Sequence, residues 1–405
     1  MMIGEIVFWL LAAAVIFALL QWLVILRLLN GFLAEGRAGA PGGASAQAAG
    51  HDGAPPNGLS VIVPIKGADD ASRAALEHLA NLPLGAETEI LFVMEEESDP
   101  AYGMVKTILE RRGARPGRGR IVLSGPCGGR MGKLHNMRAG LRQAAYDHLL
   151  FMDADVVLTP EAVEHGLKKA ADPKVGAVSA IPLYHRPASW GGLIIAAWTN
   201  DYFLPCLLGL RRIVPFPFIV GACFFTRRGV LEADHLLEEA DRYISDDAHL
   251  SERMHRAGLE TRVLPYAVTM TENKTFPEGC RHLLRWFVML KSFKPPVYFS
   301  ILNWHFIFLA LAAAVIACFT GNAVCVSAGA VLLAAAVAGK LLGAAWFNNR
   351  LKEKEPPARY WKIIVYECAV FPWVWLAGWF KRTLVWRGRT YTVGRGGVIR
   401  SVEDA

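Results

Sequence analysis

The hydrophobic pattern begins with an apolar run that has the length of a membrane helix. Residues 6–26 contain no charged side chain, and at about 1.5 Å per residue they cross a hydrocarbon core of about 30 Å. A cleaved signal peptide is the alternative, but the segment before the run carries Glu5 and no base. Because Arg27 and Arg37 follow the run, the positive-inside rule predicts an anchor over residues 1–30 with its N-terminus outside.

Two further apolar runs lie close together in the C-terminal third of the chain. They cover residues 297–318 and 323–347, and Gly321 and Asn322 form a short turn between them. We therefore predict a transmembrane hairpin over residues 297–347. Both of its ends are expected in the cytoplasm, because bases flank it on either side: Lys291, Lys294, Arg350, Lys352 and Lys354.

A fourth apolar stretch, residues 363–380, is interrupted by a charged residue and a proline. It contains Glu367 and Pro372, and a group of bases follows it: Lys381, Arg382, Arg387, Arg389 and Arg395. A full crossing would place these bases outside and hold a charge near the bilayer centre. For residues 348–405 we therefore favour a re-entrant or interfacial segment with a basic tail, and a full crossing is the alternative.

The aromatic segment over residues 190–225 is apolar but contains Arg211 and Arg212. These two charges argue against a clean transmembrane run. A lipid entrance at the membrane interface and a buried core with one solvated loop are the two interpretations of this segment.

Between the apolar runs, short β-branched stretches alternate with helical patterns. Residues 31–58 are rich in Gly, Ala and Ser and predict a flexible tether. The pattern then predicts strands at residues 59–65, 89–94, 121–123 and 148–152, and helices at residues 72–81, 101–112, 133–145 and 160–169. This alternation indicates an α/β domain over residues 59–278, with ligands at the carboxyl ends of the strands, after Ile65, Met94 and Met152.

Composition and charge narrow the classes of protein. With 53% hydrophobic and 20% charged residues, the chain is too apolar for an ordinary soluble domain and too apolar for disorder. The formal net charge of +7 is modest, which argues against a nucleic-acid partner and fits a phosphate-bearing substrate or an anionic membrane face. The 7 cysteines include no C-x-x-C pair, so neither a disulfide framework nor a zinc site is indicated. The apolar runs predict a multi-pass membrane protein, and the many small residues suggest a bacterial inner membrane. The flanking bases place the α/β domain in the cytoplasm.

Asp153 and Asp155 form the motif that most strongly suggests a catalytic or metal-binding role. A hydrophobic strand delivers these two carboxylates to its carboxyl end. Such hard oxygen ligands suit Mg²⁺ or Mn²⁺, which can bridge to a diphosphate. A solvated turn that caps the helix at Pro160 is the alternative.

Two other acidic segments carry candidate functional residues. Residues 95–99 follow a predicted strand, and Asp99 can either cap the helix that starts at Pro100 or accept a hydrogen bond from a nucleotide. Asp246 and Asp247 begin a helical pattern, where either an N-cap or a general base fits.

Basic and aromatic residues supply the remaining candidates. Lys133 follows a Gly-rich approach to a helix and can contact phosphate, although the motif is not a Walker loop. Residues 279–296 predict an interfacial amphipathic helix, with two side chains on each of two neighbouring faces: Arg281 and Arg285, His282 and Trp286.

Together these residues resemble family 2-type glycosyltransferases with the Rossmann-like GT-A fold, and more closely the ceramide glucosyltransferase family of membrane enzymes. The resemblance covers nearly the whole chain. The order of motifs is similar: the N-terminal anchor, residues 63–67, 98–101 and 133–136, Asp153-x-Asp155, Asp247, Arg285-Trp286 and residues 386–391.

The resemblance implies roles for these positions. Asp99 would contact the nucleotide, Asp153 and Asp155 would hold the diphosphate and a divalent metal, Mn²⁺ or Mg²⁺, and Arg285 with Trp286 would support donor and acceptor binding. Asp247 would be the catalytic base of an inverting displacement, moving a sugar, with glucose favoured, from a UDP-sugar to the hydroxyl of a membrane lipid such as ceramide.

Two features leave parts of this assignment open. The family pattern has Gln or Arg three residues before Arg-Trp, whereas this chain has His282 there and Arg281 one place earlier, so either residue can make the expected diphosphate contact. Hopanoid-associated bacterial glycosyltransferases share most of these motifs, so a hopanoid acceptor and an N-acetylglucosaminyl or other hexosyl donor are alternatives.

Two other functions compete with lipid glycosylation. A processive polysaccharide synthase would need a bundle of transmembrane helices around a polymer channel, and three or four apolar segments are too few to form one. A membrane scaffold or flippase with a degenerate transferase domain is the non-enzymatic alternative, and the intact carboxylates argue against it.

Overall fold

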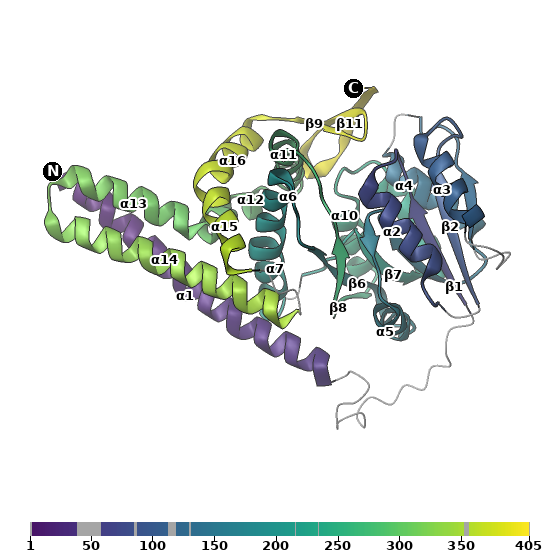
Figure 1. Cartoon of the computed structure of the whole chain (residues 1–405), viewed down its shortest axis with the longest axis horizontal. Coiled ribbons are helices and arrows are strands. Elements are labelled where there is room, and N and C mark those ends of the chain that lie inside the picture. The colour runs from purple at the N-terminus through teal and green to yellow at the C-terminus, as the bar shows by residue number, and fades with distance from the viewer. Residues whose placement is uncertain are drawn as a thin grey trace. The chain divides into compact units, whose positions relative to one another are not determined.

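The computed structural model describes residues 2–38, 58–84, 87–111, 119–128, 131–214, 216–233, 235–351 and 356–404. Most of the predicted tether, residues 39–57, lies outside these described residues. The chain divides into two compact units (Figure 1). The helical unit contains Met1–Glu35, Tyr184–Pro215 and Glu272–Lys381, and the α/β unit contains Gly36–Leu183, Phe216–Thr271 and Arg382–Ala405. Each unit thus combines three separate segments of the chain, whereas the sequence analysis expects domains that are continuous ranges. Those expected boundaries stay a prediction.

The α/β unit is built on an eight-stranded sheet with the order β3-β2-β1-β4-β7-β6-β8-β5. Its strands are β1 Leu59–Pro64, β2 Thr88–Met94, β3 Gly119–Leu123, β4 His148–Met152, β5 Val156–Val157, β6 Val175–Tyr184, β7 Cys223–Arg227 and β8 Glu260–Met270. The helices are α2 Asp70–Asn81, α3 Pro100–Arg111, α4 Gly132–Gln143, α5 Pro160–Ala170, α8 Arg228–Glu232, α9 Leu236–Ala240 and α10 Asp246–Arg256. The predicted α/β fold is confirmed.

The sheet has a parallel half that sets the position of the loops. Strands β3, β2, β1 and β4 are parallel, and β7 then pairs antiparallel with β4. The β1 sequence, Leu-Ser-Val-Ile-Val-Pro, is buried along nearly its whole length, as expected for a central parallel strand. Helix α4 lies close against this strand, because a Cβ on Gly140 would stand 2.4 Å from Ile62.

A separate three-stranded sheet ends the chain. Its order is β11-β10-β9, and its strands are β9 Thr383–Trp386, β10 Arg389–Val393 and β11 Ile399–Asp404, with a 3₁₀ turn at Arg395–Gly397. The sequence analysis expects only a basic tail here. The structure corrects that expectation, since the segment forms an antiparallel sheet within the α/β unit.

The helical unit consists of long apolar helices joined by short breaks. Its elements are α1 Met2–Ala38, α6 Trp190–Trp198, the π-helix η1 Thr199–Phe203, α7 Leu204–Leu210, α11 Phe276–Phe293, α12 Pro295–Trp304, α13 Phe306–Thr320, α14 Ala323–Arg350, η2 Pro357–Tyr360, α15 Trp361–Val365, the π-helix η3 Tyr366–Val370 and α16 Phe371–Phe380. Helix α1 continues past residue 30, where the predicted anchor ends, as far as Ala38.

The predicted hairpin forms, but its first limb is broken. Gly321 adopts a left-handed conformation with φ of 69° at the turn, and the Asn322 side chain accepts the Val324 amide at 2.9 Å to cap α14. Helices α12 and α13 meet at His305 with a bend of 63°. The amide of Phe308, in the first turn of α13, donates to the Glu367 carboxylate at 2.9 Å. A long-range partner therefore supports the break, and the local sequence did not indicate it.

The aromatic segment forms a longer helix than its two arginines suggested. The run Trp190–Leu210 is continuous through η1 and is long and apolar enough to cross a membrane. It ends at the residue before Arg211, so both arginines lie beyond the run, although the run itself contains the buried Asp201. About nine tenths (89%) of its most apolar part is buried inside the protein, which makes it a core helix of the helical unit.

The fourth apolar stretch also forms a continuous helix. Trp361–Phe380 has the length and hydropathy of a membrane span, with Pro372 in the first turn of α16 and Glu367 in the π-turn η3. Pro372 is tolerated because a π-turn precedes it. The carboxylate of Glu367 accepts hydrogen bonds from Tyr202 and from the Phe308 amide, so its charge is compensated inside the protein.

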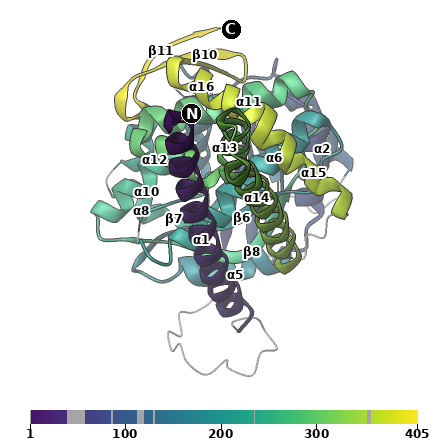
Figure 2. The same cartoon turned by 90° about the vertical axis from the view of Figure 1, so that its left-hand side faces the viewer.

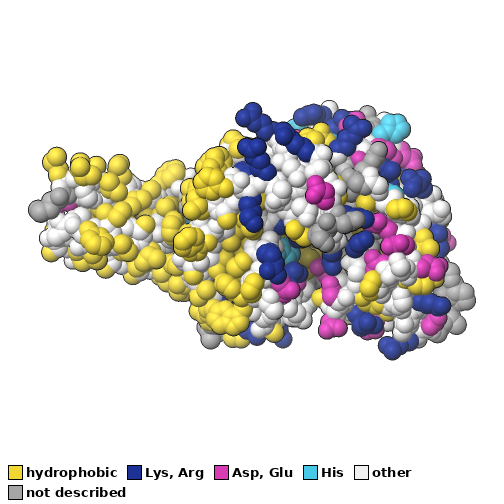
Figure 3. Space-filling view, turned by 90° about the horizontal axis from the view of Figure 1, so that it is seen from above, with side chains coloured by type: hydrophobic (Ala, Val, Ile, Leu, Met, Phe, Trp, Pro, Cys, Tyr) yellow, Lys and Arg dark blue, Asp and Glu magenta, His cyan; other side chains and the backbone are white. Residues whose placement is uncertain are grey.

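Several helices of this unit suit a lipid environment. Within the described residues, four helices are long and apolar enough to cross a membrane, and the bent pair α12–α13 makes a fifth. Helices α1, α13 and α14 run side by side (Figures 1 and 2), and Phe8, Ala313 and Cys325 pack between them. Large apolar side chains stay exposed on them, such as Leu10, Leu342 and Phe319, and hydrophobic surface covers these helices in Figure 3. Exposed apolar surface of this kind is compatible with membrane association.

Candidate active site

Asp153 lies at the carboxyl end of β4, as predicted. Its amide donates to the Ala222 carbonyl at 2.8 Å, which ties the end of β4 to the residues that lead into β7. The strand before it is buried, whereas the Asp153 side chain is one third exposed (33%). The buried strand therefore presents this carboxylate at an accessible edge of the sheet.

Lys133, in the first turn of α4, reaches the same place. Its ammonium group lies 2.7 Å from Oδ1 of Asp153 and donates to the Gly221 carbonyl at 3.0 Å. Burial alone would lower the pKa of Lys133, but the charges of Asp153, Asp246 and Asp247 raise it above its ordinary value. Lys133 is therefore held as a cation among three carboxylates.

Asp247, in the first turn of α10, completes the cluster. The amides of Gly221 and Ala248 donate to its two carboxylate oxygens at 3.2 and 2.7 Å. Burial and the charge of the adjacent Asp246 raise the pKa of Asp247, while Lys133 and the two amides act in the opposite direction. A carboxylate with a raised pKa at an accessible edge has the properties of a general base.

Gly221 joins these side chains, and the sequence analysis missed it. Its carbonyl accepts from Lys133 and its amide donates to Asp247. A Cβ at this position would lie 3.0 Å from atoms of the Asp247 side chain, so the close approach favours glycine. No local motif marks Gly221, because its role depends on the pairing of β7 with β4.

Asp155 lies in the turn between β4 and β5 and is partly exposed. Among the described residues, no group of three or more His, Cys, Asp or Glu side chains is arranged to hold a metal ion. Asp153 and Asp155 still fit a Mg²⁺ or Mn²⁺ ion by donor type, since such ions commonly take one or two carboxylates together with water and substrate phosphate.

Asp99 joins the loops that follow β1 and β2. Its Oδ1 accepts from the amides of Gly67 and Ala101 at 2.9 Å each, and the side chain is buried. Gly67 has a φ of 74°, which suits glycine. Asp99 thus makes the cap contact expected at the start of α3 and also fixes the β1 loop, as the parallel sheet predicts for two neighbouring carboxyl ends.

His282, Arg285 and Trp286 form a second cluster, in the helical unit. A guanidinium nitrogen of Arg285 donates to Nε2 of His282 at 3.0 Å, and the His282 ring meets Trp286 edge to face, with centroids 4.4 Å apart. Nδ1 of His282 lies 3.7 Å from the carboxylate of Glu272. The structure thus groups His282 with Arg285 and Trp286, whereas Arg281 is exposed.

Helix α11, which carries this cluster, begins with a capping box. The Thr275 amide donates to the Glu278 carboxylate at 2.8 Å. Its apolar face, with Leu283, Phe287 and Val288, is buried among the helices of its own unit, including α6 and α16. The amphipathic pattern of residues 279–296 is therefore explained by packing within the protein.

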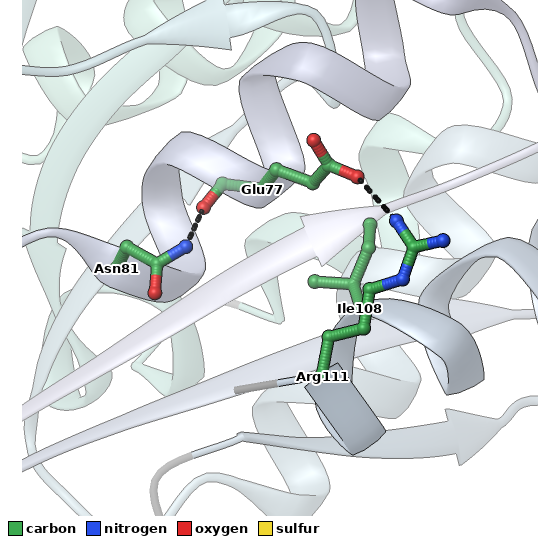
Figure 4. A pocket seen from close by; sticks show the side chains of 4 residues that line it. All are labelled: Glu77, Asn81, Ile108 and Arg111. Carbon is green, nitrogen blue, oxygen red and sulfur yellow. Dashed lines mark hydrogen bonds and ion pairs between the residues drawn. The ribbon is translucent and has the colours of Figure 1, made fainter. Parts of the chain in front are cut away.

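Elsewhere in the α/β unit, a surface pocket lies between α2 and α3 (Figure 4). Glu77 and Arg111 form an ion pair of 3.8 Å across it, and Asn81 donates to the Glu77 carbonyl. The residues around it include none of the predicted site residues, so the catalytic candidates belong to the carboxylate cluster at β4 and α10.

Comparison with known proteins decides the family. The model of glycosyl transferase family 21 matches residues 7–399. The chain belongs to glycosyl transferase family 21. The match runs from the N-terminal helix to the last strand, so the predicted architecture, an α/β glycosyltransferase domain with apolar helices, is confirmed.

Individual relatives of this family 21 protein are distant. A curated N-acetylglucosaminyltransferase of Mesorhizobium japonicum is 27% identical over 168 residues, which are 38% of this chain and 39% of that protein. The match thus spans about two fifths of the curated relative. A mannosyltransferase of Pyrobaculum calidifontis, solved with GDP-mannose and Mn²⁺, is 19% identical, with a TM-score of 0.42 over 88% of this chain and 98% of that one. GalNAc-T7, solved with UDP, GalNAc and Mn²⁺, is 9% identical, with a TM-score of 0.40 over 60% and 50% of the two chains.

Proposed function

We propose that this family 21 protein transfers a hexose from a UDP-sugar to the hydroxyl of a membrane lipid, with inversion at the anomeric carbon. The observation that carries the proposal is one connected cluster, in which Lys133 pairs with Asp153 and Gly221 joins Lys133 to Asp247. A fixed cation and a carboxylate of raised pKa are the groups that such a displacement needs for its leaving group and its nucleophile.

Asp247 is the proposed base. It would take the proton from the lipid hydroxyl while that oxygen attacks the anomeric carbon, and the bond from this carbon to the diphosphate oxygen would break on the opposite face. The two amides at its carboxylate fix the position of Asp247, and its raised pKa makes it a stronger base than an ordinary aspartate.

Lys133 would hold the diphosphate as charge develops on the leaving group. Its ammonium is already placed among carboxylates, so binding of a diphosphate would add acceptors without creating a new cation. Asp153 and Asp155 would hold Mn²⁺ or Mg²⁺, which neutralises diphosphate charge when bound. Asp99 is the proposed nucleotide contact, next to the β1 loop that it fixes.

His282, Arg285 and Trp286 are proposed to assist donor and acceptor binding. The hydrogen bond between Arg285 and His282 favours His282 over Arg281 as the partner in this motif. The apolar helices favour a lipid acceptor, and with them we propose a multi-pass protein of a bacterial inner membrane whose α/β unit faces the cytoplasm.

Glucose transfer to ceramide is the proposed reaction. The main alternative is transfer of N-acetylglucosamine or another hexose to a hopanoid or other lipid, and the curated relative of Mesorhizobium japonicum supports keeping it. A processive polysaccharide synthase is the other alternative.

Product analysis tests the proposal. Detergent-purified protein is incubated with UDP-glucose, UDP-galactose, UDP-N-acetylglucosamine or UDP-glucuronic acid, and with ceramide or a hopanoid alcohol, in Mn²⁺ or Mg²⁺. We expect a glycolipid from one donor and acceptor pair, and its loss after EDTA with recovery when metal is returned. Polymer formation, or no glycolipid from any pair, would overturn the proposal.

A further inference from the structure

The C-terminal segment contacts the α/β unit at positions far away in the sequence. Residues 382–404 form β9, β10 and β11, drawn in yellow in Figure 1. Strand β10 carries the partly buried Arg389 and the buried Tyr391, whose polar groups lie near the carboxyl end of β2 and the start of α4. No step of the proposed reaction uses this segment.

Arg389 forms a two-point ion pair with Glu95. Its guanidinium nitrogens donate to both carboxylate oxygens of Glu95 at 3.0 and 2.8 Å, and the two side chains are 17% and 6% exposed. Burial would raise the pKa of Glu95, but Arg389, together with Lys66 and the Cys127 amide, lowers it. Glu95 is therefore an anion. The two parallel hydrogen bonds fix the orientation of the Arg389 guanidinium as well as its distance from Glu95.

Tyr391 lies near the start of the helix that carries Lys133. Helix α4 begins at Gly132, and its N-cap residue is Met131. The thioether of Met131 makes no capping hydrogen bond, unlike the oxygen of a Ser, Thr or Asp side chain. Burial raises the pKa of the Tyr391 hydroxyl, whereas the Arg389 guanidinium and the Gly132 amide act in the opposite direction, so both groups lie near this hydroxyl. A side chain from 259 residues later in the chain thus approaches the first turn of α4.

Gly132 allows this close approach. A Cβ there would lie 2.8 Å from a guanidinium nitrogen of Arg389 and 3.3 Å from Oε1 of Glu95. The next residue is Lys133, whose ammonium lies 2.7 Å from Asp153. The position of the Lys133 backbone is therefore set on one side by Arg389 and Tyr391.

The far end of the same segment contacts the approach to Asp246 and Asp247. The Ile244 amide donates to the Gly397 carbonyl at 2.8 Å, and the Ile399 amide donates to the Arg242 carbonyl at 2.7 Å. Tyr243 forms an isolated β-bridge with Val398. One C-terminal segment thus contacts the start of α4, which carries Lys133, and the residues that lead into α10, which carries Asp247.

We propose that residues 382–404 form a positioning element for the donor site, in which Arg389 and Tyr391 act on the nucleotide diphosphate through Lys133. This inference rests on the proposed function, because it assigns Lys133 to the diphosphate. It makes the C-terminal sheet part of the donor site without any direct contact to the substrate.

UDP binding in the presence of Mn²⁺, measured by calorimetry on the full-length protein in detergent, tests the inference. We expect Arg389→Gln to raise the Kd of UDP about tenfold, equivalent to about 1.4 kcal/mol. Tyr391→Phe removes one hydroxyl and keeps the ring, so we expect an increase of about threefold. Arg395→Gln, an exposed arginine of the same segment, is the matched control and should leave the Kd unchanged.

A double-variant cycle separates positioning from a purely structural role. If Tyr391 acts through Lys133, Tyr391→Phe should have little further effect on UDP binding in a Lys133→Met protein. If Lys133→Met binds no UDP at all, that result supports Lys133 as the diphosphate contact. The UDP affinities of Arg389→Gln and Tyr391→Phe then decide whether the positioning role holds. If Arg389→Gln fails to fold, Tyr391→Phe, which changes the structure less, still tests the inference.

Three results would overturn the inference. Unchanged UDP affinity in both single variants would remove the positioning role alone and leave the proposed function standing. An undiminished effect of Tyr391→Phe in the Lys133→Met protein would exclude Lys133 as the intermediate. A wild-type protein that binds no UDP would overturn the proposed function and this inference together.

Discussion

Asp247 is held mainly by backbone amides, and this makes its position sensitive to Gly221. One amide comes from Gly221 and the other from Ala248, at 3.2 and 2.7 Å. A glycine that both accepts from Lys133 and donates to Asp247 couples the cation and the proposed base through one peptide unit.

Substitution of Gly221 tests this coupling. Gly221→Ala places a methyl group about 3.0 Å from Asp247 atoms, so the carboxylate must shift. We expect kcat to fall roughly 10- to 100-fold, because small displacements of a reacting group are costly. Gly229→Ala is the control, since a Cβ there meets open space among the described residues. Equal glycolipid formation rates for both variants would contradict the coupling.

The pH dependence of kcat/KM tests the state of Asp247. The base acts when deprotonated, and burial with the adjacent Asp246 raises its pKa above the ordinary 3.8. Activity should therefore be present at high pH and be lost as the pH falls through this raised pKa, earlier than for an ordinary aspartate. Activity that stays constant down to about pH 4, measured by initial rates of UDP release, would contradict the assignment.

The sequence predicted the site residues that lie next to strong local patterns. Asp153 follows a continuous buried strand, and Asp247 starts an amphipathic helix, so the sequence singled out both as candidates. Glu95 and Tyr391 lie in segments that the sequence also singled out, but their long-range contacts, like those of Gly221, are marked by no local pattern. The functional roles of all these residues stay proposals.

At the scale of elements, the parallel half of the sheet was the easiest part to predict. β4 occupies residues 148–152 as expected, because buried parallel strands show as continuous apolar runs. The bend at His305 and the C-terminal sheet were missed. The bend is supported by Glu367 from another helix, and the short strands β9 to β11 are stabilised by their contacts with the α/β unit.

The break between α12 and α13 should depend on Glu367. Its carboxylate accepts the Phe308 amide, one of the orphan donors of α13. We expect Glu367→Leu to lower the free energy of unfolding by about 1–3 kcal/mol, since it leaves a buried amide unsatisfied. Glu367→Gln keeps an acceptor and should cost less. Thermal unfolding in detergent measures both, and a Leu variant as stable as the wild type would contradict this role.

At the scale of the whole molecule, both units are assembled from interleaved segments. The helical unit takes three segments of the chain and the α/β unit takes the other three. Apolar side chains dominate the exposed surface of α1, α13 and α14, whereas the proposed base and cation belong to the α/β unit. The proposed lipid acceptor and the proposed charged donor would therefore suit different units of one chain, so the full-length protein is needed to test the reaction.

Acceptor-dependent UDP release by the wild type and by Asp247→Asn tests the central claim most directly. With the preferred UDP-sugar, lipid and metal, we predict release that requires the lipid and that falls by about 10² to 10⁴ in the variant, because the general base is lost. Tight UDP binding should persist in Asp247→Asn, since Lys133 and Asp153 remain. Release that ignores the lipid, or a variant as fast as the wild type, would contradict lipid glycosylation with Asp247 as its base.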